Sequence, residues 1–106
     1  MIKCICINDK YKPKEIPQSY WVEEGKQYHV VAIYHMVQPG AILGVILQEI
    51  TLDENCAPYE CFSIRRFGFY EEDLQALAEL IKASEGFQEF DPMKLIEEEI
   101  GELLEV

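Results

Sequence analysis

The sequence predicts a mainly β fold, a small barrel or sandwich of short strands, followed by a helical C-terminal extension. Up to residue 67, apolar and β-branched runs alternate with turn signals at intervals of roughly 8–12 residues, which is typical of small barrels and sandwiches. From Tyr70 onward, the apolar residues recur at helical spacing instead. At 106 residues the chain is near the commonest domain size, so we expect one domain with one core.

Four apolar segments predict the strands of the body, at residues 2–7, 28–36, 41–52 and 59–64. Between the first two lies a loop at 11–20 that contains two prolines, and a turn around Gly25 leads into the second strand. Residues 37–40, VQPG, interrupt the pattern before the third strand. Gly44 lies inside the third apolar run and predicts a β-bulge or a close approach of the backbone there.

Two helices are expected in the tail, over residues 70–81 and 91–104. The stretch FGFYEED is interpreted as the junction between the last strand and the first helix. Acidic residues in the first turn favour that helix through the macrodipole, and Gly86 provides its stop. Asp91 followed by Pro92 is typical of an N-cap and a first helical position. Gly101 is expected to weaken the second helix by roughly 1 kcal/mol relative to alanine.

One spacing in the body points to a known fold family. It reads aromatic–Val–x–x–Gly–x–x–Tyr–x–Val and consists of Trp21, Val22, Gly25, Tyr28 and Val30. Together with the segments EIPQSYWVEEGKQYHVV, GAILGVILQEI and PYECFSIRRF, it resembles the small, uncharacterised SH3-like barrel proteins of bacteria and their phages. The resemblance covers roughly residues 1–67.

This resemblance implies a strongly bent, five-stranded barrel without a catalytic residue. The chain lacks the ALYDY-like motif of signalling SH3 domains, so recognition of proline-rich peptides is not implied. We expect an SH3-like barrel at residues 1–69 and an acidic helical extension at 70–106 that packs on it within a single domain. Trp21 and Tyr28 are expected to be structural residues of that barrel.

The net charge of the chain, -11, narrows the partners worth testing. It argues against binding of nucleic acid, since phosphate contacts require a Lys/Arg footprint, and it disfavours anionic membrane surfaces. The charge is concentrated in the tail, where 12 Asp/Glu stand against 2 Lys/Arg from Glu71 onward. This excess favours a basic protein partner.

The sequence also indicates a compartment. The N-terminus lacks the basic start and apolar run of a signal peptide, and no apolar stretch approaches the length of a membrane span. The expected location is the cytoplasm, where cysteine thiols stay reduced.

Four cysteines are the first candidates for chemistry. Cys4 and Cys6 are two apart on a strand, so both point to one face, and Cys56 and Cys61 could complete a Cys₄ zinc site. Structural zinc sites pair C-x₂₋₄-C knuckles, whereas here the spacings are C-x-C and C-x₄-C. Buried thiols that pack as small hydrophobic side chains are therefore favoured, with a metal site and a redox pair as alternatives, and no cofactor is expected.

No motif of this chain indicates catalysis. A P-loop, a dinucleotide-binding glycine pattern and the H-E-x-x-H sequence are all absent from the sequence. His29 and His35 share a strand face but lie about 20 Å apart along an extended strand, too far for one site. We expect a non-catalytic interaction or adaptor module, and the alternative is a small metal-binding or thiol-based enzyme.

The candidate partner-binding residues are aromatic and cationic. Tyr11 and Tyr20 lie in the loop before the second strand, where exposed rings could form a recognition surface or cover the barrel's open end. Arg65 and Arg66 could bind an acidic partner or supply counter-charge to the tail. The run 97–99, three glutamates, raises the further alternative of an acidic mimic that blocks a nucleic-acid-binding protein. The last helix must bury its apolar stripe, either on its own chain or in a homodimer.

Overall fold

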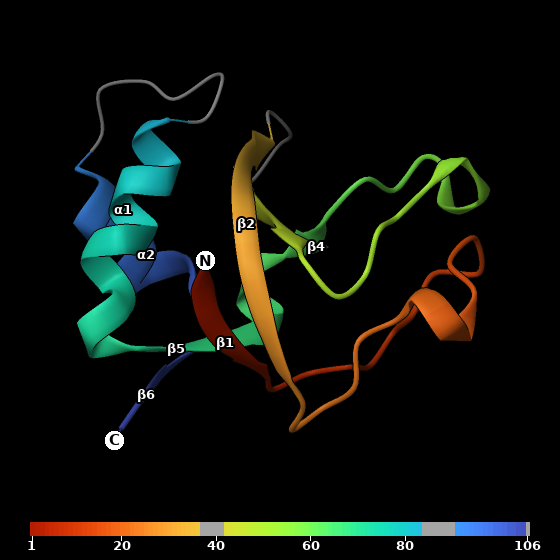
Figure 1. Ribbon diagram of the computed structural model, residues 1–106, viewed down its shortest axis with the longest axis horizontal. Helices are drawn as coiled ribbons and strands as arrows, with labels where there is room; N and C mark the ends of the chain where they lie inside the picture. Colours follow the sequence, from red (N-terminus) through yellow and green to blue (C-terminus); the bar gives the residue numbers. More distant parts are fainter. Residues whose placement is uncertain (37–41, 84–90, 106) are drawn as a thin grey trace.

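The chain forms one curled, mixed sheet of six strands, a half-barrel, with two helices on one side of it (Figure 1). The computed structural model describes residues 1–36, 42–83 and 91–105. The strands are β1 (Ile2–Cys6), β2 (Gln27–Met36), β3 (Ile42–Leu47), β4 (Phe62–Ser63), β5 (Phe67–Tyr70) and β6 (Glu102–Leu104). The helices are α1 (Leu74–Lys82) and α2 (Pro92–Glu99). The mainly β prediction is confirmed in this form.

The strand order is β4-β3-β2-β1-β5-β6, which places β1 near the middle of the sheet. Cys4 lies opposite Tyr28 of β2 on one side and opposite Phe69 of β5 on the other, both in antiparallel register. Side chains of β1 alternate between buried and half-buried, and Ile2, Cys4 and Cys6 form the buried face as the sequence predicts.

The helical reading of the C-terminus is wrong in part. Asp91 is the N-cap of α2, and its side chain accepts a hydrogen bond from Met93 N at 3.1 Å, as expected. The helix ends at Glu99, however, because Gly101 N donates to Phe67 O at 2.9 Å and turns the chain alongside β5. Residues 102–104 then pair with β5 in parallel, so the sheet has six strands and the last comes from the tail.

Two predicted strands are too long, and a second strand besides β6 was not predicted. β3 ends at Leu47 rather than at residue 52; Gln48 N still donates to His29 O of β2, and the chain then leaves the sheet. β4 has two residues instead of six. The FGFY segment, interpreted as a junction, is the strand β5, and its central place beside β1 buries Phe67 and Phe69.

A β-bulge is present in the sheet, but on a different strand from the one predicted. The register between β2 and β3 shifts between Val30 and Ala32, so Val31 is the extra residue. Gly44 pairs regularly with Tyr34 on one side and with Ser63 on the other. The predicted break at 37–40 and the stop at Gly86 lie outside the described residues.

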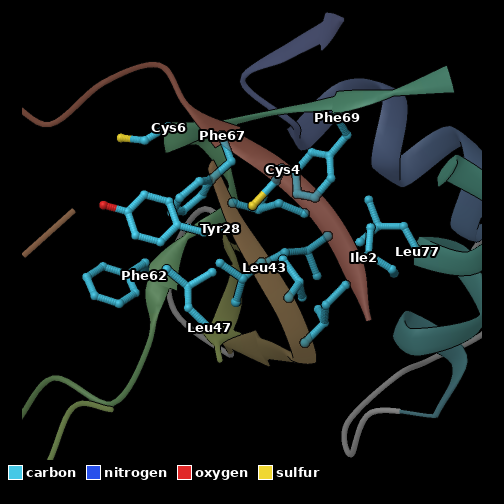
Figure 2. Close-up of a cluster of buried hydrophobic side chains, with 14 of the residues drawn as sticks. Ile2, Cys4, Cys6, Tyr28, Leu43, Leu47, Phe62, Phe67, Phe69 and Leu77 are labelled. Atoms are coloured by element: carbon cyan, nitrogen blue, oxygen red, sulfur yellow. The ribbon is translucent and has the colours of Figure 1, made fainter. Parts of the chain in front are cut away.

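The core lies inside the curl of the sheet and continues under the helices. Figure 2 shows Cys4, Tyr28 and Phe67 pointing into this space, where the rings of Tyr28 and Phe67 meet edge to face at 6.2 Å. Helix α1 adds four buried side chains at the predicted spacing: Leu74, Leu77, Ala78 and Ile81. Ile96 of α2 is fully buried in the same cluster, so α2 docks on its own chain. Among the described residues, no helix is long and apolar enough to cross a membrane.

Candidate functional site

Two long loops extend from the sheet on the side opposite the helices (Figure 1). One connects β1 to β2 and the other connects β3 to β4. Tyr20 Oη donates to Asp53 Oδ2 at 3.2 Å, which joins them. Ile16 from the first loop and Cys56 from the second are buried in the core cluster. The predicted candidate Tyr20 is thus half-buried and binds the neighbouring loop.

Tyr11 has the most exposed aromatic side chain of the described residues, with 88% of its surface accessible. Its backbone has a φ of 62°, in the left-handed region that is unfavourable for residues other than glycine. Arg66 Nη1 donates to Lys10 O at 2.7 Å on one side of it, and Lys12 Nζ donates to Ile16 O at 2.6 Å on the other. The loop therefore holds the Tyr11 ring out in solvent.

Trp21 is a buried residue that holds this loop through a side-chain hydrogen bond. Its side chain is 7% exposed, and its indole Nε1 donates to Asp9 O at 2.7 Å. The guanidinium of Arg66 lies 4.7 Å from the Trp21 ring centre, in the arrangement of a cation–π contact. Arg66 also donates to Asn8 O, so this predicted anion-binding candidate acts within the chain.

Arg65 faces the tail instead. Its Nε and Nη2 donate to Glu99 Oε2 of α2 at 3.0 and 2.7 Å. This ion pair joins the segment before β5 to the end of α2, and it is the internal counter-charge considered from the sequence. The two neighbouring arginines thus serve different parts of the fold, and only Arg66 lies with Tyr11.

Three of the four cysteines, Cys4, Cys6 and Cys61, lie in environments that disfavour thiolate chemistry. Burial, with the charge of Glu49 adding to it, raises the pKa of Cys4 to about 12. Burial also raises the pKa values of Cys6 and Cys61. Because the thiolate is both the nucleophile and the metal ligand, raised pKa values make these thiols poor at either role. In the ranges that the structure describes, no three His, Cys, Asp or Glu side chains gather as metal ligands would.

The structure also reveals a pair that the sequence did not indicate. His29 Nδ1 and Glu49 Oε2 are 2.6 Å apart, and Glu49 Oε1 accepts from His29 N at 2.8 Å. The two residues are 20 positions apart, and only the pairing of β2 with β3 brings them together. His29 lies opposite Lys3 of β1, so the side chains of these two residues share one face of the sheet. The side chain of Cys4, the next residue, points to the other face and away from His29. We assign the pair a structural role, because it binds the segment that follows β3 to the strand β2.

This pair predicts a pH-dependent stability. Burial alone would raise the pKa of Glu49, but the hydrogen bonds from the His29 ring and backbone outweigh it and lower the pKa. A lowered pKa in the folded state means that the stabilisation is present above the pKa of the unfolded chain and is lost as the pH falls through the folded value. We expect Glu49→Gln to lower the free energy of unfolding at pH 7 by about 0.5–1 kcal/mol.

Urea unfolding of both proteins between pH 7 and pH 3 checks this expectation, with the exposed Glu98 changed to glutamine as control. The difference between the native protein and Glu49→Gln should shrink as the solution becomes acidic, whereas Glu98→Gln should be no less stable than the native protein at any of these pH values. A difference that stays constant with pH would contradict the role given to the ionised carboxylate.

Comparisons with family models, with curated proteins and with solved structures find no match to this chain.

Proposed function

We propose that this chain is a non-catalytic protein-interaction module whose partner contacts the loop between β1 and β2 at Tyr11. The observation that carries the proposal is the placement of this ring. It is 88% exposed on a backbone with a φ of 62°. The left-handed conformation destabilises a residue with a side chain by roughly 1 kcal/mol. Burial of an apolar ring would offset this strain, but an exposed ring does not stabilise the fold in that way.

The hydrogen bonds around Tyr11 supply the second step of the argument. Arg66, Trp21 and Lys12 each donate to backbone carbonyls of the loop. A loop fixed in this way loses little conformational entropy when a partner binds. Exposed tyrosine on rigid backbone suits the centre of a protein interface, where aromatic residues carry much of the binding energy. Strain held at an exposed position is also a feature of functional segments.

We further propose that the half-barrel is an SH3-like barrel to which β6 is an addition. The support for this proposal is that β1 to β5 pair in antiparallel around one core. The apolar residues of the aromatic–Val–x–x–Gly–x–x–Tyr–x–Val pattern lie in that core. The buried residues of that pattern are Trp21, Val22, Tyr28 and Val30. Gly25 lies at the turn with a φ of 88°.

The alternatives have weaker support. A thiol-based enzyme, or a metal site held by the cysteines, would need thiolates, and burial works against them at Cys4, Cys6 and Cys61. An acidic mimic of nucleic acid would need a long row of carboxylates. Helix α2 has eight residues, a length of about 12 Å, and it uses Glu99 for the ion pair with Arg65.

Site-specific photo-crosslinking tests the interaction surface. A photoreactive phenylalanine analogue replaces Tyr11 in one protein and Tyr34, an exposed tyrosine of β2, in the other. In cells of the native host, we expect a discrete adduct from position 11 and none of the same mass from position 34. The partner identified in this way should then bind Tyr11→Ala at least tenfold more weakly than Tyr34→Ala. Equal affinities would overturn the proposal.

Stability measurements on Tyr11 variants separate recognition from folding. Tyr11→Gly should raise the free energy of unfolding by about 1 kcal/mol, because glycine adopts a positive φ without strain. Tyr11→Ala should stay within about 0.5 kcal/mol of the native protein, since alanine keeps the strain and the ring contributes no burial. Urea unfolding measures both values. A Tyr11→Gly protein less stable than the native one would mean that the ring supports the fold, against the proposed role.

A further inference from the structure

The second feature that suggests a partner is the edge of the sheet formed by β6. This strand pairs with β5 on one side, and no strand of the described chain lies on its other side. An edge strand presents N–H and C=O groups that a further strand can bind. The edge is firmly placed, because Gly101 N donates to Phe67 O and the side chain of Leu104 lies over Gly68. In Figure 1, β6 lies at the rim of the molecule, away from the loop between β1 and β2 that contains Tyr11.

A groove runs beside this edge. It has a volume of about 280 Å³ and lies between the end of α2 and β6. Ile100 and Leu103 give it an apolar lining, while Glu97 and Glu102 contribute carboxylates. Leu103 is 49% exposed at this edge of the sheet. An apolar side chain from a partner would cover Leu103 and gain free energy from the burial.

The charge around the groove identifies the chemistry of that partner. Glu97 and Glu102 line the groove, and two further exposed carboxylates lie near them in the sequence, on Glu98 and Glu105. None of the four forms an ion pair within the described part of the chain, where the tail's ion pairs are those of Glu79 and Glu99. Like charges gathered without counter-ions repel one another, and a cationic partner would relieve this repulsion.

We propose that the β6 edge binds an extended basic segment of another protein, which adds to the sheet as a seventh strand. Its backbone would pair with β6, its apolar side chains would enter the groove at Leu103, and its Lys or Arg side chains would meet Glu97 and Glu102. Successive side chains of a strand point to opposite faces, so the fitting segment alternates apolar and basic residues.

Other occupants fit this edge less well. A second copy of the chain, paired in antiparallel, would bring the carboxylates at Glu102 and Glu105 of the two copies close together, and like charges across paired strands are destabilising. Nucleic acid would be repelled by the same carboxylates. The proposal goes beyond the role of the Tyr11 loop, because this surface comes from the tail and uses different residues. With two surfaces, the chain could connect an interaction partner at Tyr11 to a basic segment at β6.

Synthetic peptides test the proposal directly. The first probe is an eight-residue peptide that alternates valine and lysine, and the second is the same peptide with valine and glutamate. The third has alternate backbone nitrogens methylated, so that it keeps the side chains but cannot pair as a strand. Titration followed by amide NMR should show the lysine peptide shifting the signals of residues 102–104. The methylated and the glutamate peptides should bind at least tenfold more weakly.

Matched charge variants locate the site. Glu102→Lys should weaken binding of the lysine peptide at least tenfold, whereas Glu54→Lys, with the same charge change in the loop between β3 and β4, should change it less than threefold. Leu103→Lys should also weaken binding at least tenfold. Amide NMR spectra of each variant check that the fold is retained, and Glu97→Lys provides a second variant at the groove if Glu102→Lys fails to fold.

The outcomes discriminate among the explanations. Equal weakening by Glu102→Lys and Glu54→Lys would mean attraction by net charge alone and would overturn the proposal. Equal affinity for the methylated peptide would rule out strand addition. A dimer of the native protein in sedimentation experiments that becomes a monomer in Leu103→Lys would assign the edge to a second copy instead. Failure of the Tyr11 crosslinking experiment would leave these results unaffected.

Discussion

Replacing Trp21 with alanine is expected to lower the free energy of unfolding by about 3–5 kcal/mol, the largest effect of any single change considered for this protein. The side chain is 7% exposed, its ring centre lies 5.8 Å from that of Phe62, and Arg66 stacks on it. Truncation would remove this packing and leave a cavity. It would also leave Asp9 O without the indole donor that binds it at 2.7 Å.

Urea unfolding with a fixed denaturant slope measures this loss. Trp21→Phe is the matched control, because it keeps an aromatic ring in the same place and removes the hydrogen bond to Asp9. It should lower the free energy of unfolding by about 1–2 kcal/mol. If Trp21→Ala unfolded like the native protein and instead lost a binding partner, Trp21 would have to be reassigned from the core to an interface.

The parts of the fold that the sequence predicted are those with a long, regular pattern. The alternation over β1 places Cys4 and Cys6 on the buried face, and the helical spacing over α1 identifies Leu77 and its neighbours. In each case the pattern runs for five residues or more and agrees with the burial that the tertiary structure imposes. Local preference and global packing coincide in these elements.

Where the pattern is short, prediction was poorer: β4 was predicted too long, and β5 and β6 were not predicted as strands. β4 has two residues and β6 has three, too few to define an alternation. In β5, Phe67, Gly68 and Phe69 are all buried because β1 and β6 flank the strand and Leu104 covers Gly68, so the period of two disappears. These strands are determined by their neighbours in the sheet rather than by their own sequence.

The candidate site was predicted only at the level of residue type. Tyr11 was identified as an exposed aromatic candidate, but no sequence pattern indicates its positive φ or the bonds that hold its loop. The ion pair of Arg65 with Glu99 joins residues 34 positions apart. The contact of Tyr20 with Asp53 joins residues 33 apart. Such pairs depend on the sheet topology, which a single sequence does not specify.

The substitution Gly101→Ala distinguishes two interpretations of the tail, a single helix over 91–104 or a helix followed by the strand β6. The two interpretations predict opposite changes in the free energy of unfolding. If residues 91–104 formed one helix, Gly101→Ala would raise the free energy of unfolding by about 1 kcal/mol, because alanine is the better helix former. In the structure, Gly101 lies against β5 instead. An added Cβ would be 2.8 Å from Phe67 O and 2.6 Å from Ile7 Cδ1, and it would overlap Arg65 O.

We therefore expect Gly101→Ala to lower the free energy of unfolding by about 2–3 kcal/mol. Two of the three atoms in the way are backbone carbonyls, so a rotation of side chains cannot relieve the overlap, and β6 must move away from β5. Gly68→Ala is the matched control. Its added Cβ would meet only the flexible side chain of Leu104, at 2.8 Å, and the loss should be about 1 kcal/mol.

Urea unfolding gives both values, and amide exchange of residues 102–104 reports whether β6 stays paired with β5. Gly101→Ala should speed exchange at Phe69 and Leu103, which lie opposite each other, while leaving exchange in β2 unchanged. A more stable Gly101→Ala protein with slow exchange at these amides would mean that the helix continues through residue 101. The open edge proposed to bind a basic segment would then not exist, since that edge depends on the turn that Gly101 allows.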